Sequence, residues 1–117
     1  MSLGAIDGVP LVAVEERVKA AVLLSGGFRL KRAAPEVDPV NFAPRVKVPV
    51  LLMGGRYDFQ HPLETAQLPL FAALGTPEKE KKHVIFEGGH VAPRIQPLIR
   101  EILDWLDRTQ GPVPLAT

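Results

Sequence analysis

Three short runs of branched apolar residues stand out along the chain. Each contains few polar side chains and is bounded by glycine or proline, which is typical of strands that are buried on both faces. A turn of small residues follows each run closely, and glycine there lets the backbone turn sharply. The runs are 18–24, 46–53 and 83–86, and the turns are 25–27, 54–55 and 88–89.

Helical segments are predicted to alternate with these runs. Residues 2–16 are predicted to form a helix that Pro10 weakens. A second helix is expected over 62–74, with a kink at Pro69. The clearest helix is predicted over 94–109, where apolar residues recur at helical spacing and charged residues lie largely on the other face. Its apolar positions are Ile95, Leu98, Ile99, Ile102, Leu103 and Leu106.

The order of these elements predicts the architecture. Helices that alternate with buried strands are typical of a parallel sheet covered by helices, so we predict the α/β class with about three parallel strands. The length of 117 residues suits one domain. Segment 28–47 contains three prolines and is long for a connection, so we expect a lid-like loop. Ligands of such sheets bind at the carboxyl ends of the strands, which makes the turns there the expected place for chemistry.

Composition narrows the function classes. The formal net charge is +1 and charges of both signs are interspersed, so no basic face points to nucleic acid or to a membrane surface. No apolar run is long enough for a membrane span. The absence of cysteine excludes a disulfide framework, a thiolate metal site and a cysteine nucleophile. No signal peptide is visible, which leaves the compartment open with the cytoplasm favoured.

Two acid–base groups follow predicted strands. Asp58 follows the second strand through a Gly-Gly-Arg-Tyr turn, and His90 follows the third through Glu-Gly-Gly. If these strands are parallel neighbours, the carboxylate can accept the imidazole N–H and fix its tautomer. The other histidines, His61 and His83, are expected to be structural. Because the histidines lack a spacing typical of metal ligands, we expect no metal ion and no cofactor.

A nucleophile for this pair is found at the start of the chain. Residues 1–4, Met-Ser-Leu-Gly, match the last four positions of the Gly-x-Ser-x-Gly motif, in which a serine lies on a sharp turn between a strand and a helix. The chain order Ser, Asp, His is also the order that accompanies this motif. Ser2, Asp58 and His90 are therefore the candidate catalytic triad.

The stretches around these residues resemble α/β-hydrolases of the dienelactone-hydrolase-like and prolyl-oligopeptidase-like kinds. The resemblance covers nearly the whole chain and implies the C-terminal half of that fold. The implied segments are an elbow remnant at 1–5, the lid-like loop at 28–47, the strand and loop of the catalytic Asp at 46–59, the loop of the catalytic His at 86–91, and a closing helix at 94–109.

The resemblance implies a role for each site residue. Ser2 would attack a carbonyl and form an acyl-enzyme, His90 would act as base and then as acid, and Asp58 would orient His90. The backbone N–H of Leu3 would be one donor of the oxyanion hole. The implied substrate is a small-molecule ester or a peptide.

The resemblance also implies that the strand which holds Ser2 lies before Met1. We therefore expect the parent domain to be a serine hydrolase and this chain alone to be inactive. Strand 18–24 would have an open edge, able to pair with the remainder of the parent protein or with a second copy. Two alternatives remain: a non-catalytic α/β interaction module, and half of a Rossmann-like or flavodoxin-like domain, for which turn 25–27 is a poor phosphate loop.

Overall fold

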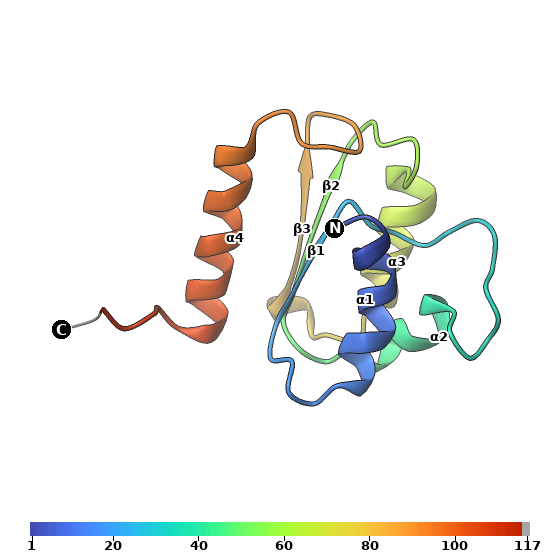
Figure 1. The fold of residues 1–117 in the computed structure, drawn as a ribbon, viewed down its shortest axis with the longest axis horizontal. Helices are drawn as coiled ribbons and strands as arrows, with labels where there is room; N and C mark the ends of the chain where they lie inside the picture. The colour runs from blue at the N-terminus through green and yellow to red at the C-terminus, as the bar shows by residue number, and fades with distance from the viewer. Residues whose placement is uncertain (116–117) are drawn as a thin grey trace.

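The computed structural model describes residues 1–115, which form a three-stranded sheet between helices (Figure 1). The strands are β1 (Ala21–Leu24), β2 (Val50–Gly55) and β3 (Lys81–Phe86). The helices are α1 (Leu3–Val14), α2 (Pro39–Phe42), α3 (Leu68–Ala73) and α4 (Ile95–Gln110). The prediction of an α/β fold with three parallel strands and flanking helices is confirmed.

The three strands start level with one another. Val50 of β2 lies opposite Ala21 of β1 and Lys81 of β3. Pairing begins there because Pro49 has no N–H to donate, and its carbonyl accepts the N–H of Ala21 at 2.9 Å. As a result β1 and β2 begin later than the apolar runs predicted, whereas β3 begins earlier. Because the strands are parallel, their carboxyl ends meet at one edge of the sheet.

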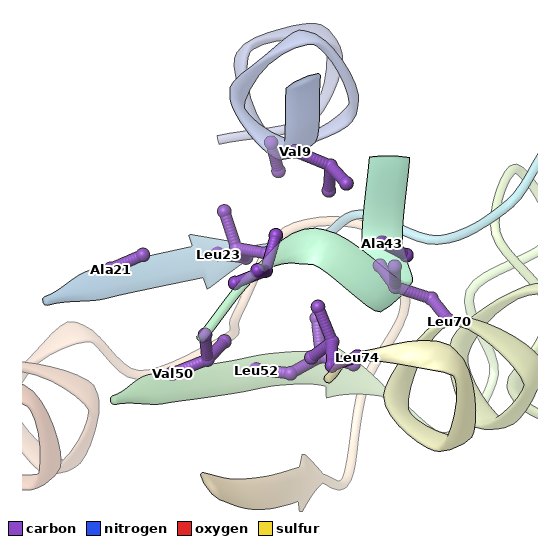
Figure 2. Packing of buried hydrophobic residues seen from close by; sticks show 10 residues of the cluster. Val9, Ala21, Leu23, Ala43, Val50, Leu52, Leu70 and Leu74 are labelled. Carbon is purple, nitrogen blue, oxygen red and sulfur yellow. The ribbon is translucent and has the colours of Figure 1, made fainter. Parts of the chain in front are cut away.

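The larger part of the core lies between the sheet and α1 and α3 (Figure 2). Alternate residues of β1 and β2 point to this face, as the pleat requires. Figure 2 shows Leu23 of β1 below Val9 of α1, and Leu52 of β2 beside Leu74. The buried members are Ala5, Val9, Ala21, Leu23, Ala43, Val46, Val50, Leu52, Leu70 and Leu74. This packing fixes α1, and with it Ser2, against the sheet.

Helix α4 covers the opposite face (Figure 1). Only part of its predicted apolar stripe packs on the sheet. Leu98, Ile102 and Leu106 pack against the cluster of Leu51 and Trp105, of which Trp105 is only 4% exposed, whereas Ile95, Ile99 and Leu103 are exposed. An ion pair between Lys82 and Glu101 joins the helix to β3. The helix ends where Gly111 adopts a φ of 83°, which glycine accepts without strain.

The segment 28–47 is more ordered than the predicted loop, because it contains α2 and a 3₁₀ turn, Ala43–Arg45. Asp38 starts α2 by accepting the N–H of Val40 at 3.0 Å. The same carboxylate pairs with Arg32 at 2.6 Å, which holds the pKa of Asp38 below its usual range. The capping explains why this part of the connection is helical.

The helix expected over 62–74 is divided. Leu63–Gln67 form a π-helical turn, and α3 follows it. Pro69 lies in the first turn of α3, directly after the π-helical turn. Gln67 ends the π-helical turn and is fully buried.

Strand β1 forms an edge of the sheet. Within residues 1–115 it pairs only with β2, so part of its backbone faces outward, as predicted. The carbonyl of Leu24 is an exception, since it accepts the N–H of Ser2 at 2.8 Å. None of the helices in the same range combines the length and apolar character needed to cross a membrane.

Candidate active site

The three residues predicted as a triad form one chain of hydrogen bonds. His90 Nε2 lies 2.8 Å from Ser2 Oγ, and His90 Nδ1 lies 2.9 Å from Asp58 Oδ2. In the tautomer that donates the Nδ1 proton to Asp58, Nε2 is the acceptor that faces the serine hydroxyl. The three side chains come from positions far apart in the sequence and meet at the carboxyl edge of the sheet.

Ser2 lies on a strained turn immediately before α1. Its φ of 52° and ψ of −115° are unfavourable for a residue with a side chain, by about 1–3 kcal/mol. The bond from its N–H to Leu24 holds the turn beside the end of β1. Among residues 1–115, no hydrogen bond uses the N–H of Leu3, which lies in the first turn of α1. That N–H and the helix N-terminus are suited to an anionic oxygen next to Ser2.

Asp58 is buried in the turn after β2, with both carboxylate oxygens satisfied. Oδ2 contacts His90, while Oδ1 accepts the N–H groups of Gln60 at 2.8 Å and His61 at 3.0 Å. Burial raises the pKa of Asp58, but the bonds from His90, His61 and Gln60 outweigh it and lower that pKa below its usual value. The carboxylate is therefore ionised and fixed where it orients the imidazole.

His90 is held by a residue of the predicted turn 25–27, to which the sequence assigned no role in the triad. Ser25 is fully buried at the end of β1, and its Oγ donates to the carbonyl of His90 at 2.6 Å. Ser25 also has a positive φ of 56°, which turns the chain away from the sheet at this point. The end of β1 thus positions the backbone of the histidine loop.

The loops after β2 and β3 are joined closely. Arg56 N–H donates to the carbonyl of Phe86 at 2.9 Å, and Tyr57 N–H donates to that of Gly88 at 3.0 Å. A Cβ on Gly55 would lie 2.0 Å from the carbonyl oxygen of Gly89, so only glycine permits this approach. The contact sets the distance between Asp58 and His90.

A buried glutamine braces the aspartate loop. Gln67 Nε2 donates to the carbonyls of Gly55 and His61, each at 2.9 Å, on the two sides of Asp58. Its Oε1 lies 3.1 Å from His83 Nε2 on β3. Sequence reasoning missed Gln67, and an isolated glutamine in a helical segment carries no signal of such a role.

His61 lies behind the triad. It is 5% exposed and its ring stacks on that of His90, with centroids 5.7 Å apart. Burial lowers the pKa of His61, which favours the neutral ring. One ligand atom from each of Asp58, His61 and His90 lies within 4.8 Å of the others. The structure thus brings together three possible metal ligands that the sequence spacing did not predict.

The site as a whole can support nucleophilic chemistry. A hydroxyl faces the free nitrogen of an oriented imidazole, and an ionised carboxylate is placed to stabilise the imidazolium. The apolar side chains of Phe59 and Val91 border the two loops and are 83% and 67% exposed. They are available to contact a bound molecule or another protein surface.

Comparison with known proteins places this geometry in a fold. No protein-family profile and no curated protein matches the sequence. A cold-adapted esterase from an Arctic intertidal metagenomic library matches with a TM-score of 0.70 and 28% identity, over 92% of this chain and 43% of that one. An esterase of Pyrococcus furiosus gives a TM-score of 0.74 and 18% identity, over 94% of this chain and 52% of that one.

A peptidase shows the same likeness. The acylaminoacyl peptidase of Pyrococcus horikoshii matches with a TM-score of 0.74 and 17% identity, over 100% of this chain and 24% of that one. This chain therefore spans between about a quarter and half of the length of these proteins. With its three-stranded parallel sheet, flanking helices and these neighbours, the chain has the fold of the C-terminal part of an α/β-hydrolase.

Proposed function

We propose that Ser2, His90 and Asp58 are the catalytic triad of a serine hydrolase that cleaves esters, or peptides, through an acyl-enzyme. The observation that carries the proposal is the continuous chain from Ser2 Oγ through His90 to the buried carboxylate of Asp58. The esterase and peptidase neighbours support this substrate class.

In the proposed reaction, Ser2 Oγ attacks the carbonyl carbon while His90 Nε2 takes the hydroxyl proton. Asp58 holds the Nδ1 proton and stabilises the charged ring. The N–H of Leu3 donates to the oxyanion that forms beside Ser2. His90 then protonates the leaving alcohol or amine, and a water molecule releases the acyl group by the same steps in reverse.

We propose further that these residues supply the triad but not a complete active site. The oxyanion hole of this fold uses a second backbone N–H from a separate loop, and loss of one donor costs about 10²–10³ in turnover. The chain spans about half the length or less of the neighbouring hydrolases. We therefore expect the isolated chain to react with a fluorophosphonate, which labels activated serines. We expect it to hydrolyse esters too slowly for the rate to be measured.

Labelling with a fluorescent fluorophosphonate tests the proposal. Intact mass first establishes that Met1 is retained, because its removal would make Ser2 the chain terminus. We expect labelling of the wild-type chain that disappears in Ser2→Ala and falls strongly in His90→Ala. Labelling of wild type and Ser2→Ala at equal rates would contradict the proposal.

A further inference from the structure

The cluster of Asp58, His61 and His90 combines side chains that suit a transition-metal ion. Zinc in proteins prefers imidazole nitrogens and carboxylate oxygens, and sites with three protein ligands keep a fourth position open. Two imidazoles and one carboxylate fit this preference, with their ligand atoms within 4.8 Å of one another. The loops after β2 and β3 hold these residues in place through the same contacts that align the triad.

His61 is the independent reason to regard the cluster as a site. Its Nδ1 is buried and has no hydrogen-bond partner among residues 1–115, although the rest of the loop is well satisfied. A buried ring nitrogen without a partner costs free energy, and such atoms are uncommon in folded proteins. A metal ion that accepts its lone pair would remove that cost.

We propose that Asp58, His61 and His90 bind a zinc ion that switches the site off. This inference rests on the proposed triad, because two of the three ligands belong to it. In tetrahedral zinc sites the ligand atoms lie about 3.4 Å apart, so the cluster has to contract slightly around the ion. The ring of His61 can turn without breaking a hydrogen bond, because none involves its side chain in residues 1–115.

Zinc binding and nucleophile activation exclude each other in this arrangement. Coordination through His90 Nδ1 replaces the contact with Asp58, and coordination through Nε2 takes the lone pair that faces Ser2. In both cases the imidazole no longer accepts the serine proton. Zinc therefore acts as an inhibitor here and takes no part in the reaction.

Zinc titration of the full chain against a chromophoric chelator tests the binding directly. We expect one ion per chain, and His61→Phe should weaken binding by at least about 100-fold, since a ligand is lost. His83→Gln is the matched control, because it removes a histidine on β3 outside the cluster and should leave the affinity unchanged. Circular dichroism shows whether each variant is folded. If His61→Phe does not fold, the His61→Asn variant is used in its place.

The outcomes separate this proposal from the proposed function. Absence of zinc binding, or equal affinity in the His61 variant and in His83→Gln, would overturn the zinc site. With the site intact, zinc should protect wild-type Ser2 from the fluorophosphonate and should not protect the His61 variant. Zinc binding that depends on His61, in a chain whose Ser2 never labels, would support the metal site and count against the triad.

Discussion

At the scale of single residues, the site depends on groups held in costly states. Ser2 has a strained backbone, and Asp58 is an ionised carboxylate with almost no exposure. Each is compensated locally, Ser2 by its N–H bond to Leu24 and Asp58 by two backbone N–H groups and His90. Such compensation is expected where the conformation serves chemistry.

The Asp58→Asn substitution should show whether the carboxylate acts by orienting His90. The amide cannot accept the Nδ1 proton in the same way and favours the wrong tautomer of His90, so the rate of phosphonate labelling should fall on the order of 10³- to 10⁴-fold. Asp104→Asn, an exposed change on α4, is the control. A labelling rate in Asp58→Asn equal to that of the control would show that the carboxylate does not act through His90.

The buried histidines predict how stability depends on pH. Burial lowers the pKa of His61 and of His83. The unfolded chain then binds more protons, so stability is complete above the unfolded pKa of about 6.5 and falls as the pH drops below it. Asp58 adds a second loss of stability at lower pH. Its pKa is lowered in the folded state, so its carboxylate stabilises the fold only above about pH 4.

Urea unfolding at about pH 7.5 and about pH 5.5 checks this sign. We expect a lower midpoint at the acidic pH, and a smaller difference in His83→Gln, which removes one titrating ring. A midpoint that stays constant or rises on acidification would mean that these rings are not buried in the neutral form.

The sequence pointed to two members of the candidate triad through short glycine-rich turns after predicted strands, and to the third through a motif. Asp58 and His90 each had such a local context, and Ser2 matched part of a known motif. Ser25 lies in the glycine turn after the first predicted strand, but nothing in the sequence indicated its bond to His90. Gln67 and His61 had no such context, since these roles arise from contacts between segments. The bond from Ser25 to His90, for example, joins residues 65 positions apart.

At the scale of elements, the site is made by two loops that approach within backbone contact. Gly55 after β2 and Gly89 after β3 meet where no Cβ has room, and Gln67 closes the aspartate loop from behind. Helices α1, α3 and α4 were predicted, most accurately α4 from its periodicity, whereas α2 was not. The strand limits were not, because they depend on where Pro49 allows pairing to begin rather than on where the apolar runs start.

The Gly55→Ala substitution should therefore lower the stability of the fold and disturb the geometry of the active site. Its Cβ would meet backbone atoms of Gly88 and Gly89, so we expect a loss of about 1–3 kcal/mol in the free energy of unfolding, together with slower labelling of Ser2. Gly4→Ala is a matched control in α1, since a Cβ there meets nothing within 4 Å and alanine favours the helix. Equal stability of the two variants, measured by urea unfolding, would argue against the close approach of the loops.

At the scale of the whole molecule, the sheet has an open apolar edge at β1 within residues 1–115. The N–H groups of Ala21 and Ser25 bond toward β2, so the alternation of a strand directs the N–H of Val22 outward. Helix α4 adds an exposed apolar stripe of Ile95, Ile99 and Leu103. An edge of this kind invites pairing with another chain.

We expect the purified chain to self-associate through β1. Light scattering at tens of micromolar should detect dimers or larger species, and Val22→Pro should reduce them because it removes an outward N–H without breaking the ladder to β2. A monodisperse wild-type monomer under these conditions would contradict the expectation.

The central claim is that Ser2 is an activated nucleophile, and the site of phosphonate attachment tests it most directly. The chain contains only two serines, Ser2 and the fully buried Ser25, and no cysteine, so peptide mass spectrometry of the labelled protein can assign the adduct. The account predicts a single phosphonyl group on Ser2, absent in Ser2→Ala and strongly reduced in His90→Ala. An adduct on another residue, or a folded chain with Met1 in place that never reacts, would contradict it.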